Sequence, residues 1–164
     1  MYKRQNIINA SFFLPSCVII SAIVALATGS SWSTSATIGI ALIGIGKALG
    51  FDIGIVAGAV ISGAYFGDKM SPLSDTTNLA PAVTGTDLFT HIRHMVWTTA
   101  PSFVVALIIF MFLGLGVSNE AEDATIKLFN QTLQEAFNIT PITLIPLVLV
   151  FYMAIKKVLS LIHI

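Results

Sequence analysis

The sequence has little charge and almost no cysteine, and these two shortages exclude several classes of protein. Asp, Glu, Lys and Arg together make up 10% of the 164 residues, whereas soluble domains average about 25%. Acidic and basic residues balance at eight each, so the net charge gives no reason to expect a nucleic-acid partner. The single cysteine, Cys17, cannot form an internal disulfide, and we interpret it as a small buried apolar residue.

Motifs that mark common enzyme and cofactor sites are also missing. The sequence has no phosphate-binding loop, dinucleotide fingerprint, nucleophile elbow or zinc-ligand spacing. His91 and His94 lie three residues apart, but no cysteine or carboxylate follows at a spacing that would complete a metal site with them. We therefore expect neither an enzyme nor a resident cofactor.

Apolar residues are abundant, at 55% of the chain with a mean hydropathy of +0.90, which is typical of a membrane protein. Apolar segments occupy about 10–28, 36–49, 53–66, 82–90, 91–116 and 141–155. The first has about 19 residues, enough to cross a hydrocarbon core of about 30 Å, and 91–116 is the clearest span. The acidic segment 117–140 has apolar residues at helical spacing and predicts an interfacial amphipathic helix. We expect an all-α, polytopic membrane protein.

The stretch GAYFGDKMSPLSDTTNLAP, residues 63–81, concentrates polar side chains between apolar segments. Pro72 removes a backbone donor and disfavours helix at Ser71, so a helix entering from Ile53 should break here. Broken backbone at membrane depth is tolerated only where protein or a water-filled cavity surrounds it, and intramembrane carboxylates usually mark an ion or proton path. The alternative is an ordinary polar loop at the water interface.

Hard oxygen donors in this stretch suit Na⁺ better than a transition metal. A single carboxylate that holds either a proton or a cation gives exchange directly, because both compete for the same oxygens. Asp75 is our first choice for this role, since it follows Pro72 where helix is least expected to resume. Asp68 is the second choice, with a structural ion pair to Lys69 as the alternative.

The run Ser30 to Thr37, SSWSTSAT, is a second candidate site, because its hydroxyls and the backbone carbonyls around Gly29 could coordinate a cation. The alternative interpretation is an outer loop in which Trp32 anchors the chain at the interface. The pattern does not decide between an intramembrane break and a loop.

Segment 53–66 is short for a span, and its small residues recur near the spacing that lets helix backbones approach closely: Gly54, Gly58, Ser62 and Gly63. If 53–66 enters the membrane and 78–90 returns as a re-entrant hairpin, then Lys47 and Arg93 fall on one side together with the basic residues at 3, 4, 156 and 157. The positive-inside rule favours this arrangement over a complete span at 53–66, which would place Arg93 on the outside.

Two strings, GSSWSTSATIGIALIGIG at 29–46 and GAYFGDKMSPLSDTTNLAPAVTGTDLFTHIRHM at 63–95, closely resemble the NhaC-type sodium/proton antiporter family. The resemblance extends to about residue 157. It implies an ion-transporter fold of two inverted repeats with interrupted helices, of which this chain would hold about one repeat. By position, the resemblance implies these site residues: Ser33, Thr34, Asp68, Ser71, Ser74, Asp75, Thr76, Thr77 and Asn78.

The resemblance further implies a secondary transporter of the prokaryotic plasma membrane that exchanges sodium for protons, with sodium-coupled exchange of organic anions such as malate and lactate as the alternative. The expected partners are Na⁺, H⁺, the lipid bilayer and the remainder of a longer parent transporter, with a homodimer left open. We expect residues 1–157 to form a partial transporter domain. Residues 158–164, which contain the run LSLIHI, are interpreted as a non-native or truncated tail.

Overall fold

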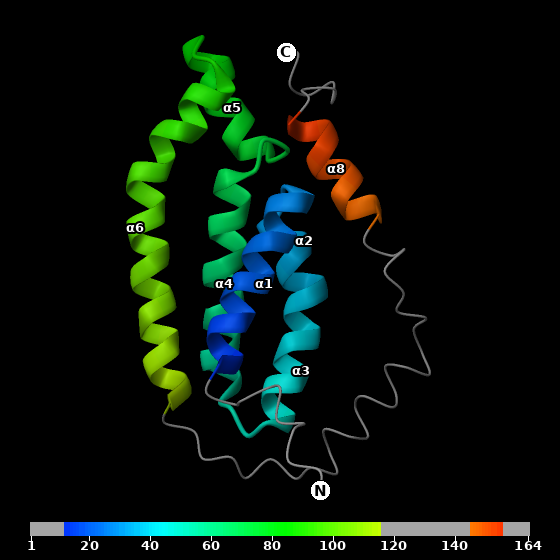
Figure 1. The fold of residues 1–164 in the computed structure, drawn as a ribbon, viewed down its shortest axis with the longest axis vertical. Helices are drawn as coiled ribbons and strands as arrows, with labels where there is room; N and C mark the ends of the chain where they lie inside the picture. Colours follow the sequence, from blue (N-terminus) through cyan, green and yellow to red (C-terminus); the bar gives the residue numbers. More distant parts are fainter. Residues whose placement is uncertain (1–11, 116–144, 156–164) are drawn as a thin grey trace, which may run out of the picture.

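The computed structural model describes residues 12–115 and 145–155, and within these ranges every regular element is helical (Figure 1). The elements are α1 (Phe13–Thr28), α2 (Ser31–Thr34), the π-helical turn η2 (Ser35–Gly39), α3 (Ile40–Ala48), α4 (Ile53–Met70), α5 (Asp75–Thr84), α6 (Leu88–Leu115) and α8 (Ile145–Ile155). The predicted all-α class is confirmed for this part of the chain. The predicted helix at 117–140 and the predicted tail at 158–164 lie outside it.

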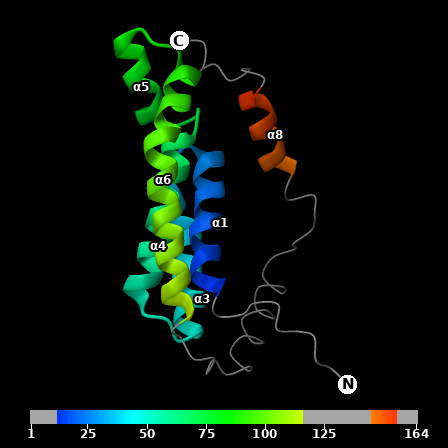
Figure 2. The ribbon, with the colours of Figure 1, turned by 60° about the vertical axis from the view of Figure 1, so that its left-hand side comes forward.

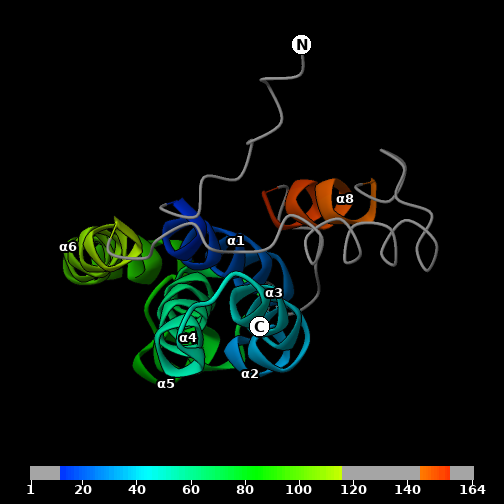
Figure 3. The same ribbon diagram turned by 90° about the horizontal axis from the view of Figure 1, so that it is seen from below.

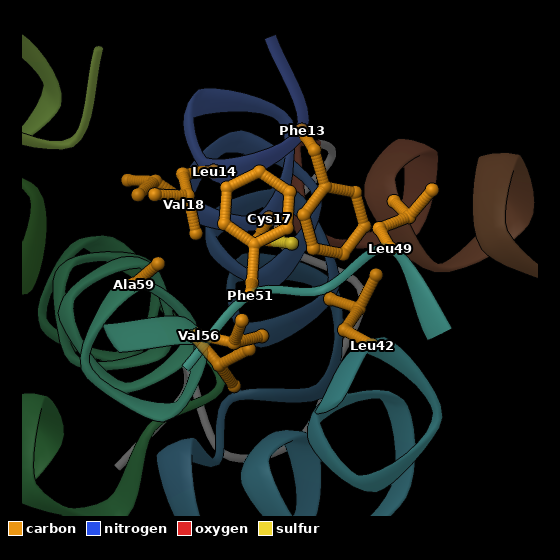
Figure 4. Packing of buried hydrophobic residues seen from close by; sticks show 10 residues of the cluster. Phe13, Leu14, Cys17, Val18, Leu42, Leu49, Phe51, Val56 and Ala59 are labelled. Carbon is orange, nitrogen blue, oxygen red and sulfur yellow. The ribbon is translucent and has the colours of Figure 1, made fainter. Parts of the chain in front are cut away.

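Helices α1, α3 and α4 pack around one core, and α6 lies beside α4 and α1 when the bundle is seen from below (Figure 3). At one end of the bundle the core is built from ten buried side chains: Phe13, Leu14, Cys17, Val18, Leu42, Leu49, Phe51, Val56, Ala59 and Val60 (Figure 4). The rings of Phe13 and Phe51 lie 5.3 Å apart between their centroids. Cys17 is fully buried and free, which confirms the interpretation of it as a core residue.

Helices α1 and α4 run parallel and come into backbone contact. A Cβ built on Gly63 would overlap the Val18 carbonyl oxygen, and one built on Gly67 would overlap the Ala22 carbonyl oxygen. Glycines four residues apart share one helix face, so together they let the two helices approach closely. The predicted close approach is therefore present.

Two of the small residues expected to make this approach do something else. Gly58 faces the Phe110 ring of α6 at 3.5 Å, and the atom nearest to Gly54 is the Asp52 carboxylate. The Asp52 side chain caps α4 by accepting from the backbone N–H groups of Gly54 and Ile55. Close contact with α1 is therefore made by Gly63, one of the four expected residues, and by Gly67, one turn beyond it.

Helix α4 continues without a break through Asp68 and ends at Met70, where Pro72 follows. The break predicted near Pro72 is confirmed. Helix α5 then lies beyond the end of α4, and α6 is the helix that runs back beside it (Figures 1 and 2). The structure does not bring 78–90 back alongside 53–66, so the re-entrant hairpin is not confirmed.

The predicted arrangement of basic residues on one side is not confirmed for Lys47 and Arg93, the two of these residues that are described. Gly46 packs against Val56, near the beginning of α4, so Lys47 lies at that end. The Phe66 ring stacks on Phe103, with 4.0 Å between the ring centroids. Arg93 precedes Phe103 by ten residues, and α6 runs antiparallel to α4, so Arg93 lies beyond Phe66 in the direction of the C-terminal end of α4. The two basic residues therefore lie toward opposite ends of α4, because α6 runs antiparallel to α4.

Helix α6 has 28 residues, and among the described helices it is the one long and apolar enough to cross a membrane by length and composition. At 1.5 Å per residue it is about 42 Å long. The expected span at 91–116 therefore corresponds to a helix that begins at Leu88. Helix α1, with 16 residues, is apolar but shorter.

Candidate functional site

Two interruptions of the helical chain, at 29–30 and at 71–74, meet in the structure. Gly29 ends α1 in the left-handed conformation with φ +67°, and Ser30 is extended and caps α2 by accepting from the Ser33 N–H at 3.2 Å. A Cβ built on Gly29 would lie 2.6 Å from the carbonyl carbon of Leu73. Only glycine combines this backbone angle with this close approach. The two polar stretches identified in the sequence are therefore in contact.

Asp68 is the buried carboxylate of this site. It lies in the last turn of α4 with 8% of its surface exposed. Its Oδ2 accepts a hydrogen bond from the Ser31 hydroxyl at 3.0 Å. Its Oδ1 is buried and has no hydrogen-bond partner within residues 12–115 and 145–155. One carboxylate oxygen is thus held by the first interruption, and the other is left open, that is, without a hydrogen-bond partner in the described ranges.

Ser71 joins the second interruption to α1. Its backbone N–H donates to the Asp68 carbonyl at 3.1 Å, and its hydroxyl donates to the Leu26 carbonyl at 2.8 Å. The same hydroxyl oxygen accepts from the Leu73 N–H at 3.2 Å. These bonds satisfy backbone groups that Pro72 leaves outside a helix.

The other predicted residues of 71–78 hold the second interruption in shape. The Thr77 hydroxyl is buried and lies 3.3 Å from the Asp68 carbonyl oxygen and 3.2 Å from that of Lys69. The Asn78 amide donates to the carbonyls of Pro72 at 2.8 Å and Ser74 at 2.7 Å. The hydroxyls of Ser74 and Thr76 lie 3.0 Å apart. Most of these polar groups bond to local backbone and so position the segment.

Asp75 lies in a different environment from Asp68. It is the first residue of α5, its side chain is exposed, and its Oδ1 accepts from the Thr76 N–H at 2.8 Å. A carboxylate at a helix N-terminus is favoured by the helix dipole. The Asp75 side chain is therefore exposed and bonded to the first turn of α5, whereas the Asp68 side chain is buried.

The first interruption contributes Thr34 and Ser33 unequally. Thr34 is buried, and its hydroxyl donates to the Ser30 carbonyl at 2.9 Å and lies 3.2 Å from the Thr28 hydroxyl. Ser33 is exposed. The residue that reaches Asp68 is Ser31, which sequence reasoning did not select, because nothing local distinguishes it from the other hydroxyls of the run.

The site lies opposite the middle of α6. Phe103, which stacks on Phe66, is 15 residues from the beginning of α6 and 12 from Leu115, or about 22 Å and 18 Å along the axis. Asp68 is two residues beyond Phe66. If α6 crosses the bilayer centrally, Asp68 lies within a hydrocarbon core about 30 Å thick.

No group of three or more His, Cys, Asp or Glu side chains that could hold a metal ion occurs in the described ranges. The donors present are one open carboxylate oxygen, hydroxyls and backbone carbonyls, which suit a hard cation rather than a transition metal. Interrupted helices that meet around such groups are typical of ion-coupled membrane transporters.

Comparison with known proteins agrees with this class. Residues 63–164 match the family described as the Na⁺/H⁺ antiporter family, and the chain belongs to that family. The family is one of membrane transporters. The relatives reported below are bacterial.

Three curated relatives show the extent of the similarity. The Na⁺/H⁺ antiporter NhaC of Alkalihalophilus pseudofirmus is 47% identical over 96% of this chain and 34% of its own length. NhaC of Bacillus subtilis is 46% identical over 87% of this chain and 31% of its own. The malate-2H⁺/Na⁺-lactate antiporter of B. subtilis is 42% identical over 96% and 34%. The chain spans about a third of the length of these relatives, and no solved structure matches it.

Proposed function

We propose that this chain forms part of a secondary transporter that exchanges sodium ions for protons across the plasma membrane of a prokaryote. The observation that carries the proposal is the buried Asp68 with one open oxygen, held where two helix interruptions meet. The names of the relatives support sodium and protons as the transported ions. Because the relatives are about three times longer, the complete transporter would add residues to this site.

A buried carboxylate explains why exchange would be coupled. An ionised carboxylate in a site of low polarity is costly unless a partner neutralises it. Either a proton or Na⁺ at Oδ1 supplies that partner, and the two cannot occupy the same oxygen together. The unloaded, charged site is therefore disfavoured during the conformational change, which limits leakage. An inward proton gradient would then drive sodium outward.

We place the exchange at Asp68 rather than at Asp75, the first choice from sequence. The exposed Asp75 carboxylate is already bonded to the backbone of its own helix. The buried Asp68 carboxylate retains an open oxygen and lies opposite the middle of α6. Ser31 and Ser71 belong to the proposed site as the groups that orient Asp68 and its neighbouring backbone, and Thr34 and Thr77 support the two interruptions.

The test uses the full reading frame that contains this chain, reconstituted in vesicles with a pH-sensitive dye and an imposed pH gradient. Addition of Na⁺ should dissipate the gradient. Asp68→Asn, which keeps the shape of the side chain but not its charge, should lower this rate at least tenfold, and Asp75→Asn should retain most of it. Full activity of Asp68→Asn at normal abundance would refute the assignment, and activity lost only in Asp75→Asn would restore the sequence-based order.

Competition gives an independent measurement. If H⁺ and Na⁺ share one oxygen, the sodium concentration for half-maximal exchange should rise by up to about tenfold for each unit by which pH is lowered. A half-maximal concentration that does not change with pH would contradict a shared site.

Sodium-coupled exchange of organic anions is the second candidate, because a relative named as a malate-2H⁺/Na⁺-lactate antiporter is 42% identical over the same residues. Dissipation of the gradient only after malate or lactate is added would favour this candidate. A sodium current without proton movement would instead indicate a channel and would exclude both.

A further inference from the structure

The helical segment that follows the first interruption contains a single wide turn. Between α2 and α3, which follow one another in the same direction (Figure 1), residues Ser35–Gly39 form the π-helical turn η2. Thr34 and Ile40 on either side of it have ordinary right-handed helical angles, so the chain stays helical throughout. No proline between Ser31 and Ala48 accounts for the wide turn. Single π-helical turns are rare, and they occur frequently at functional sites.

The pattern of burial shows what the extra residue of this turn does. Six residues of 31–49 are buried: Ser31, Thr34, Gly39, Leu42, Gly46 and Leu49. They follow one another at intervals of three or four residues, except for the interval of five between Thr34 and Gly39. In a regular α-helix, residues five apart point about 140° away from each other, whereas here both are buried. The π-helical turn therefore aligns the buried face of α2 with that of α3.

Both aligned faces contact α4. In η2 itself, a Cβ built on Gly39 would lie 2.9 Å from the Val60 side chain. In α2, the Ser31 hydroxyl donates to the Asp68 carboxylate at 3.0 Å. The hydrogen bond to Asp68 therefore depends on how α2 is rotated relative to α3.

Closure of η2 into a regular α-helical turn would change the residue that faces Asp68. If α3 kept its place, α2 would rotate by about 100°, the angle between successive residues of an α-helix. Trp32 would then take the angular position of Ser31. Because 3% of the Ser31 surface is exposed and 81% of the Trp32 surface, the indole ring does not fit the space that the serine leaves. Closure would therefore break the bond to Asp68 and withdraw α2 from the end of α4.

The orientation of Ser31 does not by itself require a π-helical turn. A regular α-helix with one residue fewer would align the same two faces, because Thr34 and Gly39 would then be four residues apart. What the extra residue adds is a second helical arrangement that the same chain can adopt.

We propose that η2 is a conformational switch that closes and reopens during transport and thereby controls access to Asp68. In the π-helical arrangement Ser31 covers the carboxylate, and in the α-helical arrangement Ser31 is withdrawn. The hydrogen bond from Ser31 is charge-assisted when the carboxylate is ionised. Na⁺ at the other oxygen keeps the carboxylate ionised, so bound Na⁺ favours the π-helical arrangement. This inference rests on the proposed function and assigns it a moving element.

The test deletes Ala36, an exposed residue of η2, from the full reading frame. The deletion keeps Ser31 and Gly39 on one face but removes the second arrangement. The Tm in detergent should equal or exceed that of wild type, and Na⁺ should still raise it, as a ligand of the folded state does. The exchange rate in the vesicle assay should fall at least tenfold. Deletion of Thr37, which is also exposed, removes the same extra residue and should give the same results.

Deletion of Ala41, an exposed residue of the regular helix α3, is the matched control. It also shortens the helical segment by one residue, but it moves Ile38 into the place of Gly39 against Val60. Since a single carbon atom added there would already lie 2.9 Å from the Val60 side chain, this variant should have a lower Tm than the Ala36 deletion. Equal destabilisation by the two deletions would contradict the alignment of faces and overturn the inference.

Wild-type exchange by the folded Ala36 deletion would overturn the inference, because η2 could not then close during transport. Misfolding of both η2 deletions, or loss of their Na⁺-dependent rise in Tm, would also overturn it, because the orientation of Ser31 would then require the π-helical turn. In each case, loss of exchange in Asp68→Asn would leave the proposed function standing. Full exchange in Asp68→Asn would instead refute the proposed function itself.

Discussion

Replacement of Gly67 by alanine tests the backbone contact between α1 and α4. In a helix interior this replacement alone stabilises by about 0.5–1 kcal/mol. Here the added Cβ would overlap the Ala22 carbonyl oxygen, so the two helices must separate by on the order of 1 Å to restore ordinary packing. Overpacking of this kind costs about 1–3 kcal/mol.

The same separation would stretch the 2.8 Å hydrogen bond from the Ser71 hydroxyl to the Leu26 carbonyl, which contributes about 0.5–1.5 kcal/mol. The expected net loss for Gly67→Ala is therefore about 1–3 kcal/mol. For a chain of this size such a loss corresponds to a fall in Tm of about 3–10 °C, measurable by tryptophan fluorescence of the purified protein in detergent.

Gly44→Ala is the matched control, because a Cβ built on this helical glycine meets nothing within 4 Å. Its Tm should equal that of wild type or rise by a few degrees, by about the gain in helix propensity. A Gly67→Ala protein as stable as Gly44→Ala would show that α1 and α4 do not meet through their backbones, and it would refute the packing described above.

Two further predictions concern the interruptions and α6. Gly29→Ala should lower Tm and exchange more than Gly85→Ala does, because both glycines have positive φ but only Gly29 has a neighbour, Leu73, within 4 Å; equal effects would indicate backbone strain without contact between the interruptions. A double-mutant cycle of Phe66→Leu and Phe103→Leu should give a coupling energy of about 0.5–1.5 kcal/mol in thermal stability, because the two rings are stacked at 4.0 Å; additive effects would contradict the register that places Asp68 opposite the middle of α6.

Local chemistry predicted much of the fold. Pro72 fixed the position of the second interruption, because proline disfavours helix at the residue before it, and α4 does end at Met70. The apolar run itself ends at Phe66, whereas the helix continues to Met70, because the polar Asp68 and Lys69 belong to the helix but not to the apolar run. The hairpin and the one-sided charge pattern were based on the positive-inside rule, which does not show how α4 and α6 pack against each other.

The arrangement of the site was less predictable, because it depends on contacts between distant residues. The hydrogen bond from Ser31 to Asp68 joins residues 37 positions apart, and no local pattern distinguishes Ser31 from the hydroxyls beside it. The same limit applies to the two carboxylates. Which of Asp68 and Asp75 is buried depends on how α1 and α2 cover the end of α4, and residue type alone does not show this. The two oxygen-rich stretches that the sequence singled out, at 30–37 and 63–81, are nevertheless the ones that contact each other in the structure.

The contact between Gly29 and Leu73 and the bond from Ser71 to Leu26 fasten the two interruptions to each other at a single corner of the bundle. A hinge motion at one interruption would therefore also move the other interruption. If the proposed transporter exposes this region to one side of a membrane and then to the other, α1 and α4 should move together as one rigid body, with the hinge located elsewhere.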